Sequence, residues 1–126
     1  MAADPQFSRL PWYPRDFASS TMLWPLVARG AYRELLDLQW NLSSVTRPGV
    51  LPDDPEGLRV AIRATALEWK IAWPCVEPKF PLVPGGRQNG RLEEHRQEAV
   101  RRYLARQKGA NLTNARRWRK RADEAI

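Results

Sequence analysis

Apolar side chains recur at helical spacing between residues 26 and 42, and this repeat decides the class of fold. The positions that share one face are Ala31, Leu35, Leu38 and Leu42, and Tyr32, Leu36 and Trp40 widen it. A face this broad must be buried against another element, so we expect this helix at the centre of a packed domain. Pro48 and Gly49 follow shortly after, which predicts that the helix ends near Leu42 and that a loop runs through Pro52.

Two further helices are predicted between residues 54 and 78. Residues 54–56 read Asp-Pro-Glu, which is typical of a helix start. Thr65 and Glu68 have the spacing of a capping box, which predicts another helix. Its inner side is expected to carry Leu67, Ile71 and Val76. Three successive helices are therefore expected before the β-hairpin described next.

A short β-hairpin is predicted next, with strands at residues 79–83 and 87–91 around the turn at 84–86. A charged helix is expected over residues 92–107, and Gly109 is expected to break it. Beyond Gly109 the spacing stays loosely helical. The predicted fold is mainly α with a small β-hairpin (α+β), a winged-helix-like domain followed by a basic C-terminal helix or tail.

The charge of the chain is segregated. Residues 1–86 contain nine basic and nine acidic residues, whereas residues 87–126 contain twelve basic and five acidic ones and carry the whole net charge of +7. The positive charge of residues 87–126 attracts polyanions, and nucleic acid is the commonest polyanion in a cell. We expect a domain over residues 1–108, with an extended N-terminal arm, and a basic tail over residues 109–126.

The length of the chain and its cysteine content limit the number of domains and the cellular compartment that we expect. A chain of 126 residues fits one domain, and its single cysteine, Cys75, allows no disulfide within the chain. No signal peptide and no apolar run of membrane-spanning length are visible. We expect a soluble protein of the bacterial cytoplasm or nucleoid.

Specific motifs resemble those of a known family. In chain order they are Trp12-Tyr13-Pro14-Arg15-Asp16-Phe17, Gly30-Ala31-Tyr32-Arg33-Glu34-Leu35-Leu36 with Trp40, Leu51-Pro52-Asp53-Asp54, Glu68-Trp69, Val76 with Phe80, and Asn89-Gly90-Arg91-Leu92 with Glu94. Over residues 11–95 they resemble the YdaU-like family of phage and prophage proteins. The resemblance implies a winged-helix fold, like the N-terminal parts of phage replication-initiation proteins, and a role near DNA replication or its control, with a replisome or helicase component as partner.

Catalytic chemistry is not indicated. The one histidine, His95, is expected on an exposed helix face, and Cys75 is expected to be a small core residue. Asp53 and Asp54 can join Glu56 at a Mg²⁺ ion, as in nucleases, but a loop and helix cap explains them more simply. We expect no enzyme, no cofactor and no metal.

The strongest candidates for nucleic-acid contact lie in the tail. Its basic side chains can neutralise phosphates, and the one aromatic residue among them can stack on a base or sugar. They are Arg116, Arg117, Trp118, Arg119, Lys120 and Arg121. Weaker candidates lie in the hairpin and the helices before it. These are Arg87, Asn89, Arg91, Lys70, Arg59 and Arg63.

An alternative function is protein binding without direct DNA contact. An adaptor or inhibitor would capture a replication partner or another host protein through exposed aromatic side chains. The candidates are Trp12, Tyr13, Trp24 and Trp73. The sequence alone leaves strand preference, partner and oligomeric state open.

Overall fold

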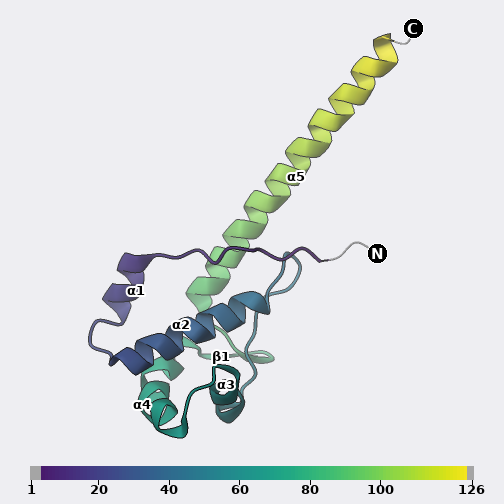
Figure 1. Cartoon of the computed structure of the whole chain (residues 1–126). Helices are drawn as coiled ribbons and strands as arrows, with labels where there is room; N and C mark the ends of the chain where they lie inside the picture. Colours follow the sequence, from purple (N-terminus) through teal and green to yellow (C-terminus); the bar gives the residue numbers. More distant parts are fainter. Residues whose placement is uncertain (1–3, 125–126) are drawn as a thin grey trace. The chain divides into compact units, whose positions relative to one another are not determined.

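The computed structural model describes residues 4–124. They form several helices and one short β-hairpin, which precedes the last helix (Figure 1). The elements are α1 (Pro14–Ser20), α2 (Leu26–Asn41), α3 (Pro55–Ala61), α4 (Ala66–Val76), a 3₁₀ turn (Glu77–Lys79), β1 (Leu82–Val83), β2 (Gly86–Arg87) and α5 (Gly90–Glu124). The fold is mainly helical with a two-stranded antiparallel sheet, which confirms the α+β class. The chain divides into two compact units, one ending at Arg96 and one starting at Gln97.

Helix α2 is the central element of the first unit, as its apolar repeat predicts. Ala28 and Leu35 are fully buried, and α2 packs along α4. Val76 and Phe80, at and after the end of α4, complete the core beside them. Helix α4 thus covers part of the wide apolar face of α2, whereas Leu42, the C-cap of α2, is exposed.

Both predicted caps are present. The side chain of Asp54 accepts a hydrogen bond from the Gly57 amide at 3.1 Å and starts α3. Thr65 and Glu68 form the reciprocal capping box that starts α4, with bonds of 2.8 and 3.1 Å. These local signals fix where the two helices begin.

The prediction for the inner face of α4 was right for Val76 and wrong for Leu67 and Ile71. Leu67 and Ile71 are 68% and 44% exposed, whereas Trp69, Ala72 and Val76 are buried. Both sets have helical spacing, and the capping box sets only the start of the helix. The helix is apolar on several sides, so periodicity alone could not tell which side faces α2.

The hairpin is shorter than predicted because the 3₁₀ turn and the start of α5 occupy its expected ends. Leu82 pairs with Arg87 and Val83 with Gly86. A third chain segment joins the hairpin, because the amides and carbonyls of Leu51 and Arg87 exchange two hydrogen bonds of 2.8 Å. A Cβ atom at Gly86 would lie 2.0 Å from the Leu51 carbonyl oxygen, so only glycine permits this approach.

The segment before α1 is extended, as predicted, and contacts the core through aromatic rings. Phe7 lies against Trp40 with ring centroids 5.9 Å apart, and the guanidinium of Arg33 lies 4.1 Å from the ring centre of Trp12. Helix α1 itself was not predicted. It begins at Pro14, whose fixed φ suits the first turn of a helix.

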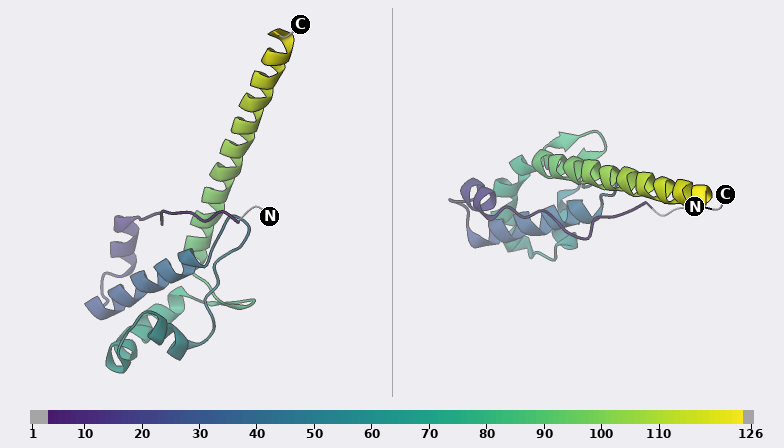
Figure 2. Two further views of the ribbon diagram at one scale, coloured as in Figure 1. Left: turned by 45° about the vertical axis from the view of Figure 1, so that its right-hand side comes forward. Right: turned by 90° about the horizontal axis from the view of Figure 1, so that it is seen from above.

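Helix α5 does not end at Gly109, in contrast to the prediction. It continues to Glu124 without a break, as both views in Figure 2 show. A glycine inside an exposed helix costs only about 1 kcal/mol, which the many good helix formers around it offset. Among residues 4–124, no helix has the length and apolar character needed to cross a membrane.

Candidate nucleic-acid interface

The basic segment of α5, defined here as residues 99–122, contains nine cations and no acid. The cations are Arg101, Arg102, Arg106, Lys108, Arg116, Arg117, Arg119, Lys120 and Arg121. Every one of these residues is exposed. Because a helix rises 1.5 Å per residue, they are distributed along roughly 30 Å of helix axis.

Acids at the two ends of the basic segment neutralise part of its charge. Glu98 pairs with Arg101 at 2.5 Å and with Arg102 at 3.3 Å, and Glu124 lies 4.0 Å from Lys120. The hydrogen bond from Arg101 lowers the pKa of Glu98, so this acid stays ionised. The cations that form no ion pair within the described residues are Arg106, Lys108, Arg116, Arg117, Arg119 and Arg121.

Trp118 lies among these cations and is 68% exposed. The guanidinium of Arg121 lies 5.4 Å from the centre of its ring, within the range of a cation–π contact. An exposed indole flanked by arginines offers an apolar surface beside phosphate-binding groups. All six tail residues predicted from the sequence lie on α5, which is continuous from Gly90 to Glu124.

The hairpin cation Arg87 has several partners within the fold. Its side chain is only 12% exposed and contacts Asp53 at 2.8 Å and Glu77 at 3.6 Å. It also donates to the Phe80 carbonyl and lies 5.3 Å from the ring centre of Trp73. Arg87 thus joins the hairpin to the loop before α3 and to the end of α4.

Asn89 and Arg91 lie at the start of α5. Asn89 is buried, accepts a hydrogen bond from the Leu92 amide at 2.9 Å, and donates to the Tyr32 hydroxyl and the Lys79 carbonyl. It is the N-cap of the helix. Arg91 is exposed and pairs with Asp16 of α1 at 2.7 Å.

The three remaining predicted cations lie on α3, on α4 and in the turn between these helices. Arg59 pairs with Glu56 at 2.5 Å and donates to the Ala64 carbonyl, and the hydrogen bond to Glu56 raises its pKa. Arg63 is exposed in the turn between α3 and α4, where its φ is 60°, and Lys70 is exposed on α4. Of the twelve predicted residues, six thus lie in the first unit and six in the second.

The carboxylates considered for a metal site all have other partners. Asp53 binds Arg87, Asp54 caps α3 and Glu56 binds Arg59. Within residues 4–124, no group of three histidine, cysteine or acidic side chains is arranged to hold a metal ion.

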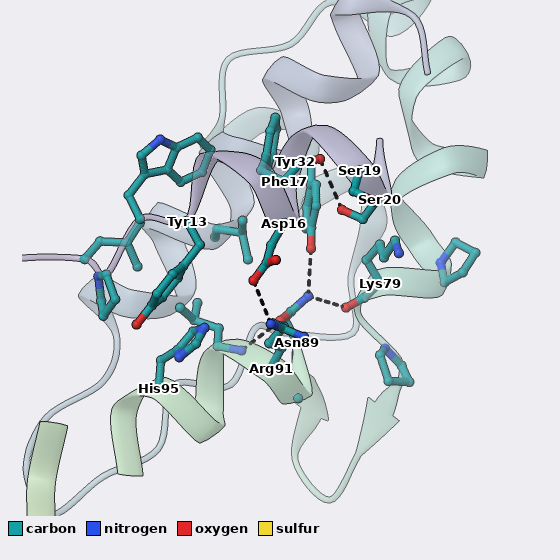
Figure 3. A pocket seen from close by; sticks show the side chains of 18 residues that line it. Tyr13, Asp16, Phe17, Ser19, Ser20, Tyr32, Lys79, Asn89, Arg91 and His95 are labelled. Atoms are coloured by element: carbon teal, nitrogen blue, oxygen red, sulfur yellow. Dashed lines mark hydrogen bonds and ion pairs between the residues drawn. The ribbon is translucent and has the colours of Figure 1, made fainter. Parts of the chain in front are cut away.

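A cavity of about 560 Å³ lies between α1, α2 and the first turns of α5 (Figure 3). Aromatic, aliphatic and proline side chains line it, and two pairs of its polar side chains bind one another, Asp16 with Arg91 and Tyr32 with Asn89. His95 stacks on Tyr13 with ring centroids 4.6 Å apart. Partial burial, followed by repulsion from Arg91, lowers the pKa of His95, so it is mostly uncharged at neutral pH.

The aromatic residues considered for protein binding make contacts within the first unit. Trp12 packs on Phe17, Trp24 on Tyr32, and Trp73 stacks on Trp69 at 4.9 Å. Leu67 and Ile71, one turn apart on α4, are more exposed than was expected. The apolar surface that faces solvent on α4 is therefore aliphatic.

The sequence reasoning did not select the first four cations of the basic segment. Arg101, Arg102, Arg106 and Lys108 precede Gly109, where the helix was expected to end. The signal that would have identified them is the absence of any acid between Glu98 and Asp123.

Searches among family models, curated proteins and solved structures found no match to this chain.

Proposed function

We propose that this protein is a non-enzymatic DNA-binding accessory protein that binds phosphates through the basic segment of α5. The observation that carries the proposal is the run of nine exposed cations without an acid along one helix. Each cation that contacts a phosphate releases counterions from the nucleic acid, and this release supplies most of the affinity of such proteins. The resemblance in residues 11–95 favours a role in phage or prophage DNA replication or its regulation.

The first unit supports a winged-helix assignment within this proposal. A winged helix combines three helices with a small hairpin, and α2, α3, α4 and the β1–β2 hairpin follow that order. The bridge between Leu51 and Arg87 adds the segment between the first two of these helices to the sheet.

The proposal assigns DNA contact to α5 rather than to α4 and the hairpin. The exposed side of α4 carries Lys70 beside Glu68 and the apolar Leu67 and Ile71, which offers phosphates little net charge. Arg87 of the hairpin is neutralised by Asp53 and Glu77. Electrostatics therefore favour the basic segment as the main contact.

Two matched triple variants of the full chain test the proposal. Arg116→Gln, Arg119→Gln and Arg121→Gln together remove three cations of α5, and glutamine preserves helix propensity. Arg9→Gln, Arg15→Gln and Arg29→Gln remove the same charge from exposed positions of the first unit. We expect the α5 variant to lose at least about 10-fold in DNA affinity at low salt and the control to lose little. Equal losses would reject α5 as the interface.

A second candidate function, protein binding, is favoured by the aliphatic surface of α4. Leu67 and Ile71 are exposed on adjacent turns, and apolar groups of this kind mark contact surfaces. The variant Leu67→Asp with Ile71→Asp would abolish capture of a protein partner and leave DNA affinity unchanged. Capture that survives this variant would reject the α4 surface.

A further inference from the structure

Between residues 107 and 118, one face of the basic segment carries no cation. Gln107, Asn111, Asn114 and Trp118 are spaced by four, three and four residues, which places them in one stripe along α5. All four are exposed. From residue 107 to residue 118 the stripe covers roughly 16 Å of helix axis.

The two asparagines of this stripe keep their full hydrogen-bonding capacity. Their side chains form no hydrogen bond within the described residues, whereas Gln107 donates to the hydroxyl of Tyr103 at 3.2 Å. Thr113, on another side of the helix, donates to the Gly109 carbonyl at 3.0 Å. Exposed asparagine is a poor helix former, so helix stability does not explain Asn111 and Asn114.

Cations flank the stripe on both sides. Consecutive residues of a helix point about 100° apart, so Arg106 and Lys108 lie on opposite sides of Gln107. Arg117 and Arg119 flank Trp118 in the same way. A helix that lies in the major groove has a phosphate wall on either side and base edges in front, which is the order of groups that α5 presents.

We infer that this stripe reads base edges in the major groove of duplex DNA, with Asn111 and Asn114 recognising adenine. The side-chain amide of asparagine can donate to N7 and accept from the N6 amino group of adenine at the same time. Trp118 offers an apolar surface to the methyl group of thymine. This inference rests on the proposed function and adds to it a substrate class, duplexes that contain A·T base pairs.

A duplex of alternating A and T, compared with the same duplex containing 7-deazaadenine, tests the inference. The modified base lacks only the N7 acceptor in the major groove, so base pairing and phosphate charge are preserved. We expect the full-length protein to bind the modified duplex about 10-fold more weakly. The variant Asn111→Ala with Asn114→Ala should bind both duplexes equally, and Thr113→Ala should discriminate like the unmodified protein.

The outcomes separate this inference from the proposed function. Tight, salt-dependent binding without discrimination between the two duplexes would overturn the reading of adenine and leave phosphate binding standing. Absence of binding to either duplex at low salt would overturn both. Alanine is a better helix former than asparagine, so circular dichroism of the double variant should show no loss of helix.

Discussion

Gln39 and Asn89 exchange two buried hydrogen bonds although they lie 50 residues apart. The side-chain nitrogen of Gln39 donates to the Asn89 carbonyl at 3.1 Å, and the Asn89 amide donates to the Gln39 side-chain oxygen at 2.8 Å. Both residues are almost fully buried, at 2% and 6% exposure. One glutamine of α2 thereby satisfies the backbone where β2 passes into α5.

Replacing Gln39 by leucine should destabilise the fold strongly. The variant Gln39→Leu leaves the buried Asn89 amide without its acceptor, which costs about 1–3 kcal/mol. The Asn89 carbonyl loses one of its two donors and keeps the Glu93 amide at 3.2 Å. Chemical denaturation measures this loss. Glu34→Leu, at an exposed position of α2, is the control and should change stability by less than about 0.5 kcal/mol. Equal stability of the two variants would contradict the buried exchange.

Arg96 should be as important for stability as any apolar core residue. It pairs with Glu93 at 2.8 Å and donates to the Ser44 carbonyl at 2.9 Å. The side chains of Arg96 and Glu93 are both nearly buried. Arg96→Ala leaves the carboxylate of Glu93 without this partner, which costs about 3–5 kcal/mol. Thermal unfolding should show a large drop, and Arg15→Ala, at an exposed position, should show almost none. An unchanged melting temperature for Arg96→Ala would be incompatible with this role.

Local signals in the sequence located most elements of the first unit. The repeat of apolar residues located α2, and the caps at Asp54 and Thr65 located the starts of α3 and α4. Each of these signals depends on residues within four positions of one another. The side of α4 that is buried could not be predicted, because it depends on how α4 packs on α2.

Long-range pairs were not predictable from a single sequence. Nothing near Gln39 indicates that its partner is Asn89, and nothing near Arg91 indicates Asp16. The predicted interface illustrates the same limit, since the charge of Arg87 was visible but its burial against Asp53 was not. The exposed cations at residues 116–121 could be identified from the sequence because exposed charge needs no partner. The sequence did not indicate that the helix continues through Gly109, and the four cations before Gly109 were therefore missed.

His95 should titrate below the usual range of histidine. Partial burial, and then the charge of Arg91, lower its pKa from 6.5. The chain has one histidine, so a proton NMR titration reports it directly. Because the folded pKa is below the unfolded one, the contribution of neutral His95 to the free energy of unfolding is complete above pH 6.5. It is lost as the pH falls from 6.5 through the lower pKa of the folded protein. Arg91→Gln should raise the pKa, and a midpoint above 6.5 in the unmodified protein would refute the described environment.

Gly109→Ala should strengthen α5. Apart from the neighbouring residues and the backbone of α5 itself, no atom lies within 4 Å of the position that its new Cβ would occupy, so the change gains helix propensity without a clash. The gain is about 1 kcal/mol, which corresponds to roughly fivefold slower amide exchange around residue 109. Hydrogen exchange followed by mass spectrometry measures this. Unchanged exchange there would mean that the helix is not continuous at Gly109.

The salt dependence of DNA binding tests the central claim most directly. If the basic segment contacts about five to nine phosphates, the logarithm of the association constant should fall against the logarithm of salt concentration with a slope of about −4 to −8. The variant without Arg116, Arg119 and Arg121 should show a slope shallower by about 2–3. A slope near zero in the unmodified protein, or an unchanged slope in the variant, would contradict DNA binding through α5.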